Sequence, residues 1–324
     1  MGSAVMWGTR YRASWSALWA ISGVHLSALA ACLLVLTLAV PGAAAAGRVQ
    51  RGLSIASPNL GREISYSIYL PEGTGEVGRR FPVVYLFHGV GDDESAWLVH
   101  GDIAKTLDRK ISKRELQPVI VVMPMAGNSW YVDDARSNGY GNMAEALTND
   151  IIAGIDGLYP TAPCSAARAV GGLSMGGFGA ILYALTKPNY FAAAFSLSGS
   201  LFTDRPAEII VRKDRFAKMF GGVYGEPFDP ERFRSWTVFD RLKHASPAAA
   251  KLKYWLAAGD KDFSGILSGT VRLHQELLER GIASELRITS GGHTWELWSQ
   301  SIDPALSWLS PLLDSGCATQ TSPG

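Results

Sequence analysis

Short, uninterrupted apolar runs recur along this chain and alternate with segments of helical periodicity. The runs are rich in β-branched residues, as is typical of strands buried on both faces of a parallel sheet. They lie at residues 83–87, 119–123, 168–172, 193–197, 254–258 and 285–288. Helical segments separate them, at residues 143–158, 177–185, 270–280 and 295–313. This alternation predicts an α/β fold with a mostly parallel central sheet and helices on both faces.

Three segments fall outside this regular pattern. Residues 64–70 alternate between apolar and polar side chains, which predicts an edge or hairpin strand. Residues 200–247 are less regular and rich in aromatic and charged side chains, so we expect an excursion between two strands, which is either a cap over a pocket or a surface insert. Residues 315–324 are polar and form an expected flexible tail.

The first 46 residues differ in composition from the rest of the chain. Arg10 and Arg12 precede a stretch, residues 13–46, that contains no Asp, Glu, Lys or Arg. The stretch is strongly apolar in its second half and ends in Ala44-Ala45-Ala46, the small residues that a signal peptidase requires. We therefore predict a signal peptide over residues 1–46, cleaved before Gly47, and a single domain over residues 47–314.

An uncleaved membrane anchor is the alternative, because residues 17–40 are long enough to cross a bilayer. Both interpretations export the domain, so we expect a secreted or periplasmic protein. After cleavage of a signal peptide, no stable association with a membrane is expected.

Overall composition excludes several classes of partner. The chain has 30 Lys and Arg residues against 29 Asp and Glu residues, so no basic field is available to hold nucleic acid. Two cysteines, Cys164 and Cys317, remain after residue 46, and they either pair or stay as free thiols. Because the chain has no Cys-x-x-Cys motif and no Cys/His cluster, we expect neither a metal nor a cofactor.

A serine flanked by glycines lies between a predicted strand and a predicted helix. Gly172-Leu173-Ser174-Met175-Gly176 follows the run at 168–172 and leads into a helix that begins near Gly177. On such a sharp turn the serine backbone is strained and its hydroxyl projects clear of the sheet. The same letters also occur by chance in ordinary tight turns, but the strand before and the helix after favour Ser174 as a nucleophile.

A serine hydroxyl needs a base to take its proton, and histidine is the usual one. His274 lies inside a predicted helix, His88 precedes the serine, and His100 and His244 lie in irregular segments. Only His293 occurs in a glycine-flanked loop after the last predicted strand. Its position agrees with the order serine, acid, histidine that accompanies this serine motif, so we predict His293 as the base.

The acid that orients such a histidine should follow a strand between the other two residues. The run at 254–258 leads into Gly259-Asp260-Lys261-Asp262-Phe263. Asp260 and Asp262 both qualify, because either could accept the second imidazole N–H. Their spacing alone does not decide between them.

An oxyanion formed at Ser174 requires two backbone N–H donors. One is expected on the residue after the nucleophile, Met175, and the other on a loop after an early strand. The segment His88-Gly89-Val90-Gly91 ends the run at 83–87, and we predict Val90 as the second donor. The alternative is that His88-Gly89 simply forms a turn that ends the strand.

Seven segments of the chain, in this order, form a recognisable pattern. They are Tyr85-Leu86-Phe87-His88-Gly89, Trp97, Met123-Pro124, Asn128-Ser129-Trp130-Tyr131, Gly172 to Gly177, Gly259 to Phe263, and Gly291 to Trp295. Together they resemble the family known as putative esterase, which includes esterase D (S-formylglutathione hydrolase), tributyrin and feruloyl esterases, and the mycobacterial mycolyltransferases. The resemblance covers about residues 60–312 and implies an α/β-hydrolase fold. It also implies that the acid is the aspartate directly before the phenylalanine, Asp262, and that Val90 and Met175 are the amide donors.

Departures from the family pattern narrow the expected activity. The formylglutathione hydrolases carry a cysteine in the loop that reads Gly89 to Glu94 here, and the mycolyltransferases usually have Met-Ala where Met175-Gly176 stands. We therefore expect a secreted serine carboxylesterase that acts on small-molecule esters with short acyl or aryl-acyl groups. The alternative is an acyltransferase of the mycolyltransferase type. A non-catalytic binding protein on the same fold and a serine peptidase are the more remote alternatives.

Aromatic residues near the predicted site suggest how the acyl group is held. Trp97, Trp130 and Tyr131 lie in loops at the carboxyl edge of the predicted sheet, where ligands of α/β proteins bind. We predict that they line the substrate pocket together with Met175. The alternative is that the two tryptophans only pack the loops, since tryptophan is well buried on average.

Overall fold

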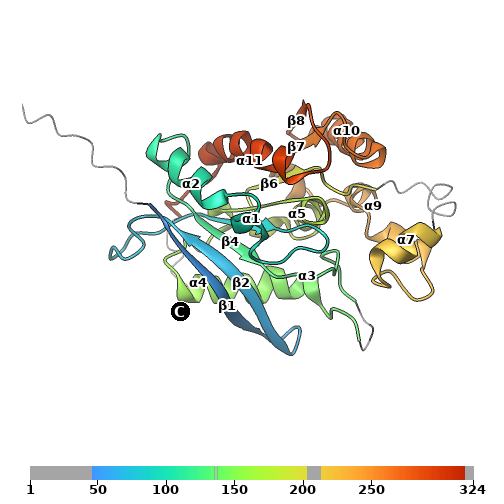
Figure 1. Ribbon diagram of the computed structural model, residues 1–324, viewed down its shortest axis with the longest axis horizontal. Coiled ribbons are helices and arrows are strands. Elements are labelled where there is room, and N and C mark those ends of the chain that lie inside the picture. The colour runs from blue at the N-terminus through green and yellow to red at the C-terminus, as the bar shows by residue number, and fades with distance from the viewer. Residues whose placement is uncertain (1–45, 135, 137, 203–212, 318–324) are drawn as a thin grey trace, which may run out of the picture. The chain divides into compact units, whose positions relative to one another are not determined.

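A single mixed sheet forms the centre of the protein. The computed structural model describes residues 46–317 except 135, 137 and 203–212, and within these residues the sheet has eight strands in the order β1-β2-β4-β3-β5-β6-β7-β8 (Figure 1). β1 pairs antiparallel with β2, and β2 antiparallel with β4, whereas the other neighbours are parallel. The strands are β1 Arg48–Ser57, β2 Arg62–Leu70, β3 Val83–Phe87, β4 Ile120–Pro124, β5 Arg168–Leu173, β6 Ala193–Leu197, β7 Lys253–Gly259 and β8 Ser284–Thr289.

Helices cover both faces of the sheet, as the alternating sequence pattern predicted. Figure 1 shows α2 and α11 on one side and α3 and α4 on the other. The helices are α1 Ala96–Val99, α2 Ile103–Ser112, α3 Met143–Glu145, a π-helical turn Ala146–Asp150, α4 Ile151–Leu158, α5 Met175–Thr186, α7 Lys213–Phe220, α8 Pro230–Ser235, α9 Val238–Lys243, α10 Ser264–Glu279 and α11 Trp295–Leu309. This arrangement confirms the α/β-hydrolase class.

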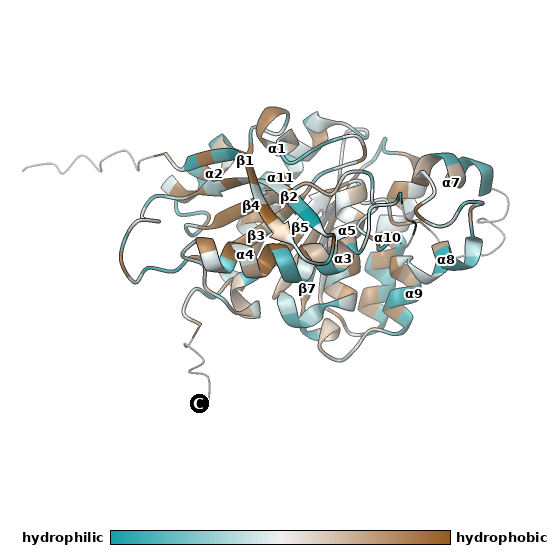
Figure 2. Ribbon diagram, turned by 90° about the horizontal axis from the view of Figure 1, so that it is seen from below, coloured by the Kyte–Doolittle hydropathy of each residue, from teal (hydrophilic) through white to brown (hydrophobic). Residues whose placement is uncertain are grey.

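The parallel strands β3 to β7 are buried because their side chains enter two separate cores, whereas the edge strand β8 is half-buried or exposed. In β3, Val83, Tyr85 and Phe87 pack in one cluster with α4 and α5, while Val84 and Leu86 pack in the other with α2 and α11. Successive side chains of a strand point to opposite faces, so a strand between two helical layers must be apolar throughout. In Figure 2 the strands β3 and β4 are accordingly coloured as hydrophobic.

Polar side chains mark where several helices begin. Asp229 accepts hydrogen bonds from the backbone N–H groups of Glu231 and Arg232 at the start of α8, and Thr237 accepts one from Asp240 at the start of α9. These side chains satisfy N–H groups that have no partner inside the helix. They explain why the irregular excursion after β6 still contains short, defined helices.

The N-terminal hairpin differs from the expectation. β1 was not predicted. Residues 64–70 were predicted as an edge or hairpin strand, and the hairpin alternative is correct, because β2 pairs with β1 and lies between β1 and β4. β1 carries polar side chains such as Arg48 and Arg51, and most of it is exposed or half-buried. A strand with so little buried surface has no continuous apolar run to reveal it.

Cys164 and Cys317 form a disulfide, with their Cα atoms 6.2 Å apart. The sequence left this pairing open. Among the described residues no helix is both long and apolar enough to cross a bilayer. Residues 1–45 of the predicted signal peptide and residues 318–324 of the predicted tail lie outside the described part of the chain.

Candidate active site

Ser174 occupies the sharp turn between β5 and α5. Its φ of 50° and ψ of −116° are strained for a residue with a side chain. The turn is possible only because glycines lie on both sides. A β-carbon on Gly172 would lie 2.7 Å from the backbone of Gly176, and one on Gly176 would lie 2.6 Å from the carbonyl oxygen of His88. These close approaches explain the spacing of glycines around the serine.

His293 and Asp262 lie in line behind the serine. His293 belongs to the loop between β8 and α11, and its Nε2 is 2.9 Å from Ser174 Oγ. Its Nδ1 is 2.9 Å from Asp262 Oδ1, in the loop after β7. Only 16% of the His293 side chain is exposed and none of the Asp262 side chain. The structure therefore brings together the three residues that the sequence singled out.

The two aspartates after β7 have different partners. Asp260 Oδ1 accepts a hydrogen bond from the backbone N–H of Gly291, with N and O 3.0 Å apart. Asp260 thus anchors the loop that carries His293, whereas Asp262 contacts the imidazole ring itself. This geometry separates two residues that the sequence spacing could not.

Asp262 remains ionised beside the imidazole. Burial alone raises the pKa of this carboxyl group, but hydrogen bonds from His293 and from the backbone N–H of Phe263 outweigh that effect and hold the pKa below its usual value. A charged carboxylate at this position accepts a hydrogen bond from Nδ1–H and favours the tautomer whose unprotonated Nε2 faces Ser174.

Two backbone N–H groups near Ser174 have no acceptor. Within the described part of the chain, the N–H groups of Val90 and Met175 donate no hydrogen bond. Met175 is the first residue of α5, so its amide also lies at the positive end of a helix dipole. Val90 is 46% exposed and shares a cavity with Ser174. Both groups are thus free to bind an anion, as the predicted oxyanion donors must be.

His88, on the other side of this loop, is a structural residue. It is 1% exposed, and burial lowers its pKa. Its Nδ1 lies 2.8 Å from the carbonyl oxygen of Gly89, and its Nε2 accepts a hydrogen bond from the backbone N–H of Ala126. A neutral imidazole with Nδ1 protonated satisfies both contacts.

A cavity of about 420 Å³ opens onto Ser174 and His293. Its walls come from the Val90 loop, the segment around Trp130, the excursion after β6 and the start of α10. Most of the lining is apolar, and Arg215 supplies a cation. The remaining lining residues are Ser200, Phe202, Phe216, Met219, Phe263, Ser264, Gly265 and Ile266.

Three of the predicted pocket residues lie elsewhere. Trp130 lines the cavity as expected, but Trp97, Tyr131 and the buried side chain of Met175 do not, and that part of the prediction is wrong. Trp97 is 1% exposed, donates its indole N–H to the carbonyl oxygen of Phe87, and packs with α2 and α11. Tyr131 is fully buried and stacks on the Phe87 ring. Both side chains point into the core because they find a partner there, the Phe87 carbonyl oxygen for Trp97 and the Phe87 ring for Tyr131.

Most of the cavity wall was not predicted from the sequence. Phe202, Phe216 and Met219 come from the excursion over residues 200–247, and Phe263 and Ile266 flank the start of α10. The many aromatic residues of the excursion were the one sequence feature that could have indicated its part in the cavity wall. Among the described residues, no group of three or more His, Cys, Asp or Glu side chains is placed to hold a metal ion.

Comparison with known families agrees with this geometry. The model of the family described as putative esterase matches residues 57–309. The chain belongs to the putative esterase family. The match extends from the end of β1 to the end of α11. The matched region of this esterase-family chain therefore includes nearly the whole sheet and the residues Ser174, Asp262 and His293.

Named relatives of this family member are distant. Esterase Rv1288 of Mycobacterium tuberculosis is 27% identical over 275 residues, which cover 78% of this chain and 58% of the relative. The chain thus spans less than two thirds of that relative. An acetyl esterase of Caldicellulosiruptor saccharolyticus is 26% identical over 238 residues, covering 71% of this chain and 84% of the relative.

Solved structures show the same fold. A ferulic acid esterase superposes with a TM-score of 0.68 at 20% identity, covering 83% of this chain and 99% of the other. MPT51 of Mycobacterium tuberculosis superposes with a TM-score of 0.64 at 19% identity, covering 84% of this chain and 100% of the other. At this level of identity the likeness concerns the fold alone.

Proposed function

We propose that this protein is a serine hydrolase of carboxylic esters in which Ser174 is the nucleophile, His293 the general base and Asp262 the orienting acid. One observation carries the proposal. Ser174 Oγ, the His293 ring and Asp262 Oδ1 are joined by two successive contacts of 2.9 Å, at the floor of a cavity large enough for a small molecule.

Acylation proceeds through this line of side chains. Ser174 Oγ attacks the ester carbonyl carbon while His293 Nε2 takes the hydroxyl proton, and Asp262 stabilises the resulting imidazolium. The carbonyl oxygen becomes an oxyanion, which the N–H groups of Val90 and Met175 bind. The tetrahedral intermediate then collapses, His293 donates its proton to the departing alkoxide, and an acyl-serine and an alcohol result.

Deacylation repeats these steps with water. His293 takes a proton from a water molecule whose oxygen attacks the acyl carbon, and the same two N–H groups bind the second oxyanion. Collapse returns the proton from His293 to Ser174 Oγ and releases a carboxylic acid. An alcohol that replaces this water would give acyl transfer, so the acceptor alone distinguishes the hydrolase from the acyltransferase alternative.

The cavity supports substrates with short acyl or aryl-acyl groups. Rings of Trp130, Phe202 and Phe216 form apolar walls against which an aromatic or short aliphatic group packs. Each methylene buried there contributes about 0.8 kcal/mol, so kcat/KM should rise with acyl length only until about 420 Å³ is filled. The relative named acetyl esterase, from Caldicellulosiruptor saccharolyticus, agrees with this size class.

A panel of chromogenic esters with increasing acyl length tests the function. Hydrolysis and labelling by a fluorophosphonate probe should both disappear in Ser174→Ala, whose fold should be unchanged. We expect an optimum at acetyl to butyryl or at cinnamoyl-type esters. A Ser174→Ala variant that keeps its activity would refute the assignment of Ser174 as the nucleophile. A kcat/KM that increases steadily up to palmitoyl esters would refute the proposed substrate class. Repeating the panel with an alcohol acceptor detects transfer.

We also propose that the domain is exported and begins near Gly47. The disulfide supports export, because disulfides persist in oxidising compartments. The backbone nitrogen of Gly47 is 2.7 Å from Asp108 Oδ1. Cleavage before Gly47 would turn this nitrogen into an ammonium group, which the carboxylate binds more strongly. N-terminal sequencing of protein from the medium or periplasm tests this, and a full-length protein in the membrane fraction would contradict it.

A further inference from the structure

The loop that carries Val90 is held at three points by the segment over residues 126–131. The Tyr131 hydroxyl donates to the carbonyl oxygen of His88, with the oxygens 3.0 Å apart. The backbone N–H of Ala126 donates to His88 Nε2 over 3.0 Å. On the far side of Val90, the backbone N–H of Gly91 donates to Asn128 Oδ1 over 2.8 Å. The free N–H of Val90 therefore lies between two anchored peptide groups.

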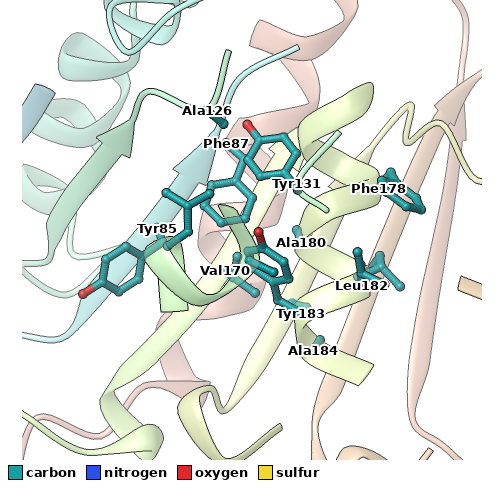
Figure 3. Packing of buried hydrophobic residues seen from close by; sticks show 14 of the residues in the cluster. Tyr85, Phe87, Ala126, Tyr131, Val170, Phe178, Ala180, Leu182, Tyr183 and Ala184 are labelled. Atoms are coloured by element: carbon teal, nitrogen blue, oxygen red, sulfur yellow. The ribbon is translucent and has the colours of Figure 1, made fainter. Parts of the chain in front are cut away.

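Tyr131 is held firmly enough to act as an anchor. Its ring stacks on Phe87, with the ring centroids 4.5 Å apart, and it has no exposed surface (Figure 3). A β-carbon on Gly179 of α5 would lie 2.4 Å from this ring, so the helix leaves space for it. Trp130 and Tyr131 have φ values of 54° and 56°. Such strained residues persist only where their surroundings fix them, and they cluster at functional sites.

The His88 carbonyl sets the direction of the peptide groups that lead to Val90. Gly89 has no side chain to restrict its backbone, so the orientation of the next N–H, on Val90, depends on the anchors before and after it. The same carbonyl oxygen faces the serine turn, since a β-carbon on Gly176 would lie 2.6 Å from it. The Tyr131 hydroxyl thus connects the anion-binding loop with the turn that carries Ser174.

We propose that Tyr131 is a positioning residue for the oxyanion hole, which it serves by holding the His88 carbonyl so that the Val90 N–H faces the oxyanion, with Asn128 holding the loop from the other end. This inference rests on the proposed hydrolase function. It assigns the residue predicted as a wall of the pocket to a different task, because Tyr131 contacts the loop and not the cavity.

The chain offers a matched control for the hydroxyl. Tyr183 of α5 is fully buried in the same cluster, with its ring 6.3 Å from that of Tyr131 and 5.6 Å from that of Phe87 (Figure 3). Within the described residues its hydroxyl has no hydrogen-bond partner. Tyr131→Phe and Tyr183→Phe therefore remove the same atom from the same core, but only the first releases the loop.

The two variants should differ in kcat on 4-nitrophenyl butyrate. Loss of a complete oxyanion donor costs about 10²- to 10³-fold, so a misplaced one should cost about 10- to 100-fold. We expect this fall in kcat for Tyr131→Phe with KM unchanged. The affinity for a short-chain trifluoromethyl ketone, which forms an oxyanion on Ser174, should fall by a similar factor. Tyr183→Phe should match the wild type in all three values.

Asn128→Ala provides a second test that does not disturb the core. Asn128 is exposed, and its variant should also lower kcat and ketone affinity without changing KM. Asn142→Ala is its control, because Asn142 is an exposed asparagine whose side chain makes no cap hydrogen bond. Melting temperatures of all four variants show whether each one folds.

The possible outcomes separate this inference from the proposed function. Hydrolysis that survives in Ser174→Ala would refute the function and, with it, the inference. An inactive Ser174→Ala together with a fully active Tyr131→Phe would refute the inference alone. Equal losses in Tyr131→Phe and Tyr183→Phe would also overturn it, because both would then act through packing. If Tyr131→Phe does not fold, an Asn128→Ala variant with wild-type kcat overturns it.

Discussion

Asp262 and Asp260 lie two positions apart, yet they should contribute very unequally to turnover. Asp262 contacts His293 Nδ1 directly, whereas Asp260 holds the backbone of the same loop. We expect Asp262→Asn to lower kcat on the order of 10⁴-fold, because the amide favours the wrong imidazole tautomer. Asp260→Asn loses one hydrogen bond and should cost far less. Steady-state kinetics on one ester measure both, and equal losses or the reverse order would contradict the assignment.

His88 should make the fold sensitive to mild acid. Burial lowers its folded pKa below the value of about 6.5 that it has in the unfolded chain. Below about pH 6.5 the unfolded state therefore binds a proton that the folded state does not. The free energy of unfolding must fall as the pH drops from there toward the folded pKa.

Urea titrations of wild type and His88→Gln at about pH 7.5 and about pH 5 measure this effect. The variant should be less stable at the higher pH, because the contact with Ala126 is weakened. It should lose less stability between the two pH values, because it has no proton to bind at this position. An identical loss in both proteins would show that other groups cause the acid sensitivity.

At the level of single residues, chemistry was easier to predict than packing. Ser174 and His293 follow from residue type, local context and chain order, and Asp262 followed from the resemblance. The prediction that Trp97 and Tyr131 line the pocket failed for a different reason. A large aromatic side chain in a loop can turn toward the pocket or into the core, and only the neighbours that the fold brings together decide which.

Most of the secondary-structure elements were predictable in proportion to their burial. The parallel strands lie within one or two residues of their predicted bounds. For β3 to β7 the reason is that two buried faces produce an apolar run, whereas β8 was predicted although its residues are half-buried or exposed. β1 escaped prediction because it is largely exposed. α2 was overlooked although Ile103, Leu107 and Ile111 recur at helical spacing, so its signal was present in the sequence. What the sequence could not show is that Lys110 on the same face is 1% exposed and pairs with Asp303 and Glu115.

Substitution of two glycines in α10 by alanine should change the free energy of unfolding in opposite directions. A β-carbon on Gly269 would lie 2.1 Å from the carbonyl oxygen of Leu201, whereas one on Gly265 would meet nothing within 4 Å. Gly269→Ala must push backbone apart and should lower the free energy of unfolding by about 1–3 kcal/mol. Gly265→Ala should raise it by up to about 1 kcal/mol through helix propensity. Urea denaturation measures both, and a stabilised Gly269→Ala would disprove this close contact.

In the whole molecule, the sheet positions the reacting residues and the excursion after β6 forms part of the cavity wall. The carboxyl ends of β5, β7 and β8 lead directly to Ser174, Asp262 and the His293 loop, which is where parallel sheets place their ligands. The excursion adds Phe216 and Met219 to the cavity wall. The sequence therefore predicts the reaction better than the substrate, because the excursion has no regular pattern from which its packing could be derived.

The disulfide should stabilise the molecule without affecting the reaction. Cys164 lies before the start of β5 and Ser174 after its end, so the six residues of the strand separate them by roughly 20 Å. The disulfide joins residues 153 positions apart and restricts the unfolded chain, and its loss typically costs about 2–4 kcal/mol. We therefore expect Cys317→Ser to lower the midpoint of urea unfolding while kcat and KM stay at their wild-type values.

Cys164→Ser and the double variant complete this test. Each single substitution removes the same covalent bond, so the two losses should be equal and the double variant should lose no more than either one. Thiol titration under denaturing conditions shows the bond directly, because the wild type should have no free thiol at these positions and each single variant should have one. Additive losses of stability would mean that the two side chains act separately. In that case the pairing of Cys164 with Cys317 would be wrong, and the support that it gives to export would be lost.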